Sequence, residues 1–178
     1  MTVIAWRISL KEYSGCAFNG EGTFRRGGRW NSPGRYIVYV AESLALASRE
    51  YLAGIPLSEL VIPSMVYLQV DIDERMIEAI DKHKLPRNWA AAEHSNATQK
   101  LGDNWYDEGR SLALRVPSAI IPVGHNYLLN RKHPDFDSLI ISKAKLFTFD
   151  ERTETVLAKA MIEKELERER IIRIKKRR

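Results

Sequence analysis

The pattern of apolar and polar positions divides the first 150 residues into short strands and helices. Apolar residues alternate with polar ones over Val3–Leu10, which is the period of a half-buried strand. Tyr36–Ala41 is continuously apolar, as expected of a strand covered on both faces. The other predicted strands are Met65–Ile72, Leu112–Val116 and one strand or hairpin within Ser138–Phe149, besides a short apolar piece at Ile120 and Ile121.

Helices are predicted between these strands from capping and terminating residues. Ser43 can cap a helix that Gly54 and Pro56 end, and Asp73 can cap a short helix that Pro86 ends. The other predicted segments are a helix over Ser95–Asp107 and a glycine-rich loop over Asn19–Gly34. Strands and helices that alternate irregularly are typical of an α+β fold.

Composition adds a globular body and a basic tail to this picture. A chain of 178 residues with 44% hydrophobic content can bury a core, and it has no apolar run of membrane-spanning length. We therefore expect a cytoplasmic protein without membrane contact. From Glu151 onward there are ten Lys/Arg and six Asp/Glu, so the tail carries most of the net charge of +5. The tail is predicted to be a solvated helix, or one whose Arg173–Arg178 end contacts nucleic acid or an acidic partner.

Common catalytic and metal-binding motifs are missing from the sequence. It has no phosphate-binding GxxxxGK[ST] loop, no HExxH, no GxSxG and no GxGxxG. The four histidines lack the spacing of a metal site, and the single cysteine, Cys16, fits a small filler residue. We expect neither a metal ion nor a bound cofactor.

Three residues remain as candidates for chemistry, each with an ordinary structural alternative. Arg29 follows a Gly-Gly pair whose amides can approach an anion, but it could also be a surface cation. Tyr39 could be a core aromatic, and Glu50 a surface acid. A carboxylate in partly apolar surroundings can also stabilise the cationic sugar that forms when an N-glycosidic bond breaks.

Two long stretches resemble one bacterial family. They are GRWNSPGRYIVYVAESLALASREYL and LGDNWYDEGRSLALRVPSAIIPVGHNYLLNRKHPDFDSLIISKAKLFTFDER, and the opening WRIS fits as well. The chain is similar to the RES domain, the toxin of RES-Xre toxin-antitoxin pairs. The resemblance covers residues 3 to 152, which suggests a RES domain over 1–152 and a charged, helical tail over 153–178.

The resemblance implies an ADP-ribosyltransferase-like fold, a mixed split sheet around a cleft for NAD+. Glu50 would stabilise the oxocarbenium-like ribose, with Arg29 on the pyrophosphate, Tyr39 at the nicotinamide-ribose end and Ser118 as an orienting hydroxyl. Without the resemblance, Ser118 would be interpreted as a loop residue whose hydroxyl hydrogen-bonds to nearby backbone. Glu42 also resembles a recurrent acid of the family, but we rank it second to Glu50 as the catalytic carboxylate. Other positions that match the family and would shape or bind at the site are Asn126, Tyr127 and Asn130.

The implied function is growth arrest by cleavage of the nicotinamide-ribose bond of NAD+, with water or phosphate as acceptor. NAD+ would be a substrate rather than a cofactor. The implied partner is an Xre-like helix-turn-helix antitoxin, through which the toxin would meet DNA indirectly. Two alternatives stay open: transfer of ADP-ribose to a target protein, and a non-enzymatic nucleic-acid-binding protein acting through the basic tail.

Overall fold

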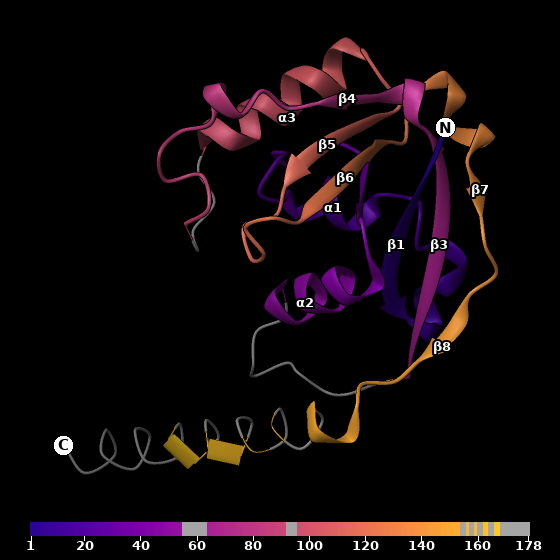
Figure 1. The fold of residues 1–178 in the computed structure, drawn as a ribbon, viewed down its shortest axis with the longest axis vertical. Helices are drawn as coiled ribbons and strands as arrows, with labels where there is room; N and C mark the ends of the chain where they lie inside the picture. Colours follow the sequence, from indigo (N-terminus) through magenta and orange to yellow (C-terminus); the bar gives the residue numbers. More distant parts are fainter. Residues whose placement is uncertain are drawn as a thin grey trace.

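The computed structural model describes residues 1–54, 64–91 and 96–153 and, in the tail, Val156, Lys159, Ile162, Glu163, Leu166 and Glu167. Within these residues, eight strands form one mixed sheet in the order β4-β5-β6-β2-β1-β3-β7, and β8 also pairs with β3 (Figure 1). The strands are β1 (Thr2–Leu10), β2 (Ile37–Ala41), β3 (Met65–Asp73), β4 (Ile77–Ala79), β5 (Ala113–Pro117), β6 (His125–Asn130), β7 (Ile140–Ile141) and β8 (Lys145–Phe147). The predicted α+β class is confirmed.

The sheet divides between β1 and β2. β1 and β3 pair along their full length, whereas β1 meets β2 in register only at Trp6 and Ala41. The two halves pack on each other through one buried cluster, to which Ala5 and Val70 contribute from one half and Val38 and Leu129 from the other. This core covers one face of β2, β5 and β6, and helices pack on the opposite face of these strands.

Three α-helices accompany the sheet: α1 (Glu21–Arg26), α2 (Leu44–Gly54) and α3 (Asn96–Glu108). Leu46 and Ala47 of α2 pack near the end of β2, and Trp105 of α3 packs against Leu114 and Leu128 of the central strands. Figure 1 shows α3 above β5 and β6 and α2 below them. The residues that connect β5 to β6 lie against α2, where a Cβ on Gly124 would be 3.1 Å from Cδ2 of Leu46.

Most strand predictions and the α2 prediction are confirmed. β1, β2, β3 and β5 fall within a residue or two of their predicted bounds, and α3 matches the predicted helix from Asn96 onward. The Ser43 hydroxyl accepts a hydrogen bond from the Leu46 N–H at 3.1 Å, so Ser43 does cap α2. Pro56, Ser95 and the Arg173–Arg178 end of the tail lie outside the described residues.

The helix predicted between Asp73 and Pro86 is wrong. The Asp73 carboxylate does accept from the Arg75 N–H, but only a 3-10 turn over Glu74–Met76 follows. The chain then forms β4, which pairs in parallel with β5. Parallel pairing depends on a strand that is distant in sequence, so local spacing of apolar residues could not show it.

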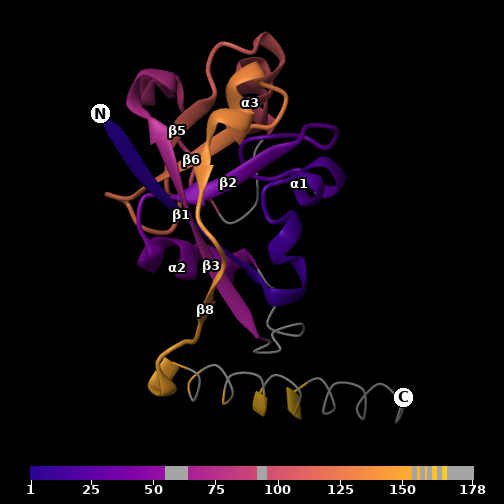
Figure 2. The same cartoon turned by 90° about the vertical axis from the view of Figure 1, so that its right-hand side faces the viewer.

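Three further segments differ from prediction. The loop over Asn19–Gly34 contains α1, whose N-cap is Gly20 and which Gly27 ends at a positive φ of 69°. Just before α1, the Asn19 side chain accepts from the Glu21 N–H at 2.9 Å. β6 was not predicted, because its polar ends obscure a strand that pairs on both sides. β7 and β8 do not form a hairpin; each pairs with β3, along whose edge they run in Figure 2.

Within the described part of the chain, no helix combines the length and the apolar character that crossing a membrane requires.

Candidate functional site

A half-buried carboxylate on α2 lies at the centre of the candidate site. Oε1 of Glu50 accepts a hydrogen bond from the Ser118 hydroxyl at 2.7 Å and another from Nδ2 of Asn126 at 2.6 Å. Ser118 directly follows β5, and Asn126 is in β6 opposite Val116. One carboxylate oxygen on α2 is thus held by two donors that come 68 and 76 residues later in the chain.

The turn after β5 holds the Ser118 hydroxyl in place. Ser118 is only 2% exposed, and its oxygen accepts hydrogen bonds from the N–H groups of Ile120 and Ile121, each at 3.1 Å. The Ser118 N–H donates to the Gly124 carbonyl at 2.9 Å, which closes the turn. With its oxygen occupied as an acceptor twice, the hydroxyl has its proton free to donate to Glu50.

Tyr39 projects from β2 into the loop that precedes this strand. Its hydroxyl donates to Oδ1 of Asn31 at 2.7 Å and accepts from the Trp30 N–H at 3.1 Å. A Cβ on Gly28 would lie 2.8 Å from the same hydroxyl oxygen, so only glycine leaves it room. Desolvation, followed by a smaller effect of Asp103, raises the pKa of Tyr39, which keeps the phenol neutral.

Helix α3 fixes the loop that carries Arg29. The Gln99 amide donates to the carbonyls of Gly28 and Asn31 at 3.0 and 3.2 Å, and the Ser32 N–H donates to Oδ1 of Asp103 at 3.0 Å. A Cβ on Gly102 would come within 1.8 Å of the Trp30 carbonyl oxygen, so the helix approaches the loop backbone as closely as a glycine allows.

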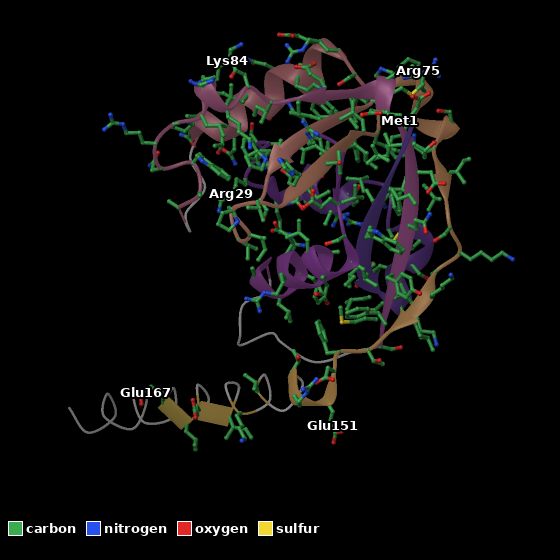
Figure 3. The ribbon with its side chains drawn as sticks, viewed as in Figure 1. Met1, Arg29, Arg75, Lys84, Glu151 and Glu167 are labelled. Atoms are coloured by element: carbon green, nitrogen blue, oxygen red, sulfur yellow. The ribbon has the colours of Figure 1, made fainter. Side chains whose placement is uncertain are left out.

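The Arg29 guanidinium is half-buried and lies on the open side of the molecule between α3 and α2 (Figure 3). Its Nη1 donates to the Trp89 carbonyl at 2.6 Å. Burial lowers the pKa of Arg29, while the negative charge of Glu50 acts in the opposite direction. A partly desolvated guanidinium is stabilised by an added anion such as a phosphate group, which it can bind through two parallel hydrogen bonds.

The structure thus brings Arg29, Tyr39, Glu50, Ser118 and Asn126 into one region. Tyr39 and Asn126 share a face of the sheet, because Tyr39 pairs with Leu128 and Ala41 with Asn126. Ser118 makes the local backbone bonds of its structural alternative, to Ile120 and Ile121, as well as the bond to Glu50.

Tyr127 requires a correction. It pairs with Val40, is 6% exposed and packs in the core between the two halves of the sheet. Neighbouring residues of a strand point to opposite faces, so Tyr127 faces away from Glu50, whereas Asn126 faces toward it. We assign Tyr127 to the core rather than to the site.

Two other predicted residues have structural contacts. Asn130 is 1% exposed, and its amide donates to the Tyr106 carbonyl at 3.2 Å, which ties β6 to α3. Glu42 is exposed, and its Oε2 lies 3.2 Å from Nδ1 of His125. The carboxylate of Glu42 is therefore engaged next to the site, whereas that of Glu50 is bound by Ser118 and Asn126.

Sequence reasoning missed Asn31, Gln99 and Trp89 as part of this region. Asn31 is fully buried, and it lies in the GGRWN stretch that was singled out for Arg29 alone. An asparagine three residues after a Gly-Gly pair was a signal that could have been used, because asparagine side chains in turns hydrogen-bond nearby backbone. For Gln99 and Trp89 no signal was available, since both reach the loop across about 60 to 70 residues of sequence.

The chemistry available here is that of a fixed carboxylate and a nearby cation. Among the described residues, no group of three His, Cys, Asp or Glu side chains is placed to hold a metal ion. The carboxylate can stabilise developing positive charge, and the guanidinium can bind an anionic part of the same molecule.

Comparisons with known proteins agree on one family. The family model described as RES domain matches residues 4–150. The chain is 36% identical to Toxin Res of Photorhabdus laumondii over 84% of this chain and 96% of that protein. It is 32% identical to Toxin Res of Yersinia enterocolitica over 84% and 99%. A protein of Sphingobium sp. called Prs ADP-ribosylating toxin is 30% identical over 85% and 97%.

A solved structure shows the same architecture. The MbcT-MbcA toxin-antitoxin complex of M. tuberculosis matches with a TM-score of 0.67 and 18% identity, over 83% of this chain and 85% of the matched chain. At this identity the likeness concerns the fold. The predicted mixed sheet with flanking helices is confirmed.

Proposed function

The chain belongs to the RES domain family, and on this premise we propose that it is a toxin that cleaves the nicotinamide-ribose bond of NAD+. The observation that carries the proposal is the Glu50 carboxylate, held by Ser118 and Asn126 close to the Arg29 cation. NAD+ offers matching groups, since it has a pyrophosphate for the guanidinium and a ribose that becomes cationic as its glycosidic bond breaks.

In the proposed reaction, Arg29 binds the pyrophosphate and Tyr39 packs at the nicotinamide-ribose end. The C1′–N bond breaks with its electron pair going to nicotinamide, which leaves as a neutral molecule. Glu50 stabilises the oxocarbenium-like ribose by its negative charge. Ser118 and Asn126 hold the carboxylate in one orientation, so little reorganisation is needed in the transition state.

The acceptor then forms a new bond to C1′. Water would give ADP-ribose after losing a proton to solvent, and inorganic phosphate would give ADP-ribose 1″-phosphate. We propose hydrolysis or phosphorolysis as the reaction and distinguish the two by experiment. NAD+ is consumed in both, and its depletion is the route by which we propose that the toxin arrests growth.

Transfer of ADP-ribose to a protein is the second candidate. It is favoured by the likeness to the Sphingobium protein, which is called an ADP-ribosylating toxin. The same oxocarbenium-like ribose can be attacked by a protein side chain, so the role proposed for Glu50 would be unchanged. We also infer an antitoxin partner, because the matched M. tuberculosis structure is a toxin-antitoxin complex. An Xre-like helix-turn-helix protein would carry the DNA contact.

The test is incubation of the purified full-length chain with NAD+, with and without phosphate. Free nicotinamide with ADP-ribose supports hydrolysis, and a phosphate-dependent product supports phosphorolysis. Labelled protein in an added lysate would support transfer. Intact NAD+ combined with salt-sensitive nucleic-acid binding would overturn all three and favour the basic tail as the functional element.

Two matched acid variants sharpen this test. Glu50→Gln keeps the shape and removes the charge, so turnover should fall by at least about a hundredfold, the effect of losing one stabilising group of this kind. Glu42→Gln makes the same change on an exposed acid that contacts His125. We expect near wild-type turnover from it. A folded Glu50→Gln variant that turns over NAD+ normally would contradict the assignment.

A further inference from the structure

Trp89 is an aromatic residue at the site that the proposed chemistry leaves without a role. It lies in the connection between β4 and α3, where its backbone N–H donates to the Pro86 carbonyl at 3.0 Å. Its ring centroid is 5.9 Å from that of Trp30, with the planes tilted by 34°. Trp89 packs on the edge of the core beneath α3 but is only half-buried, so part of the indole remains accessible.

The backbone of Trp89 is joined to the anion-binding cation. Its carbonyl accepts the Arg29 Nη1 hydrogen bond at 2.6 Å. A guanidinium has five N–H donors, and within the described part of the chain this is the one side-chain hydrogen bond that Arg29 makes. The other N–H groups of Arg29 are available to phosphate oxygens. The indole of Trp89 belongs to the residue whose carbonyl Arg29 contacts.

Arg29 links the candidate carboxylate to Trp89. Glu50 acts on Arg29 electrostatically, and the Trp89 carbonyl accepts a hydrogen bond from it. In NAD+ the pyrophosphate lies between the nicotinamide riboside and the adenosine. With the nicotinamide end at Glu50 and the pyrophosphate on Arg29, the adenosine lies on the other side of the pyrophosphate from the scissile bond, and Trp89 is the half-buried aromatic residue whose carbonyl Arg29 contacts.

We propose that Trp89 forms the adenine subsite, stacking the purine on its accessible indole surface while Arg29 holds the diphosphate. Aromatic side chains bind bases by their faces, and a tryptophan offers the largest such surface. This inference rests on the proposed use of NAD+ at the same site. It predicts that Trp89 determines the preference for NAD+ over a mononucleotide that has the same scissile bond but no adenosine.

Nicotinamide mononucleotide is the probe that separates the two ends, since it has the same bond to nicotinamide and no adenine. Trp89→Ala should raise KM for NAD+ by roughly 5- to 150-fold, the range that alanine substitution at base-stacking aromatics spans. The kcat for NAD+ and the kcat/KM for nicotinamide mononucleotide should change little. Trp89→Phe should restore much of the affinity for NAD+.

Leu85 supplies the matched control. It belongs to the same connection and packs on the same part of the core as Trp89. Leu85→Ala therefore loosens the segment without removing an aromatic surface, and it should lower activity on both substrates equally or not at all. An equal loss on both substrates in Trp89→Ala would assign Trp89 a packing role and overturn the proposal.

Calorimetric titration with ADP tests the subsite without turnover. The wild-type chain should bind ADP more tightly than Trp89→Ala by the same factor as above. If NAD+ stays intact but this difference is found, the proposed reaction fails while the adenine subsite holds. If NAD+ is cleaved but both proteins bind ADP equally, or neither binds it, the subsite is overturned and the reaction holds.

Discussion

Removal of the Ser118 hydroxyl is the most informative single change at this site. The Ser118→Ala variant deletes the 2.7 Å hydrogen bond to Glu50 and leaves the Asn126 bond at 2.6 Å to the same oxygen. It also leaves the N–H groups of Ile120 and Ile121 without their side-chain acceptor. The carboxylate keeps its charge but loses one of the two contacts that orient it.

The magnitude follows from the type of bond lost. A hydrogen bond to a charged group contributes about 1.5 to 3 kcal/mol. If this contribution orients Glu50 in the transition state and is not already made in the bound ground state, kcat should fall roughly 10- to 150-fold, since about 1.4 kcal/mol corresponds to a factor of ten. The free energy of unfolding should fall by about 2 to 3 kcal/mol, because the half-buried N–H groups can be partly satisfied by water.

The assay is steady-state release of nicotinamide from NAD+, with urea denaturation as the stability control. Because Ser118 orients another residue, the loss should be in kcat, with KM little changed. Asn126→Ala and the double variant complete a thermodynamic cycle. Both bonds end on Oε1 of Glu50, so the two losses should not add. A folded Ser118→Ala variant with wild-type kcat would refute the idea that this hydroxyl positions Glu50.

Three further changes test neighbouring parts of the site. Arg29→Lys keeps the charge and loses the planar fork, so KM for NAD+ should rise roughly 10- to 150-fold with a smaller effect on kcat, and an unchanged KM would argue against pyrophosphate binding. Gly28→Ala would place a Cβ 2.8 Å from the Tyr39 hydroxyl oxygen, which should cost about 1 to 3 kcal/mol of unfolding free energy and reduce turnover. Gly22→Ala is the matched control, because no atom lies within 4 Å of its added Cβ, and chemical denaturation of both variants should show the contrast. Burial raises the pKa of Tyr39, so the folded chain holds this proton to a higher pH than the unfolded chain, and stability should fall as the pH rises above about 10. Tyr39→Phe should make that alkaline fall in unfolding free energy shallower, and equal slopes for the two proteins would show that the phenol is not desolvated.

Local patterns predicted those elements whose signals are local. The apolar runs of β1, β2 and β3 and the Ser43 cap of α2 were read from neighbouring residues, and the structure confirms them. β4 and β6 were not predicted, because each depends on pairing with strands elsewhere in the chain. The asparagines at the ends of β6, Asn126 and Asn130, are buried by their tertiary contacts.

The candidate site shows the same division. Family resemblance selected Arg29, Tyr39, Glu50 and Ser118, and their types suit the chemistry. The resemblance also selected Tyr127, which the alternation of side chains along β6 places on the other face. Asn126 was expected to shape the site, and only the structure shows that its amide donates to the same oxygen as Ser118.

The sequence by itself determined the α+β class, the main strands and the residue types that the family shares. These follow from periodicity, capping and motif, which are properties of neighbouring positions. The tertiary structure alone decided which face each residue occupies and which carboxylate is held. Glu42 and Glu50 are both acids near the end of β2, but only Glu50 receives the two donors from β5 and β6. That difference arises because contacts between distant segments depend on how the strands pair and the helices pack.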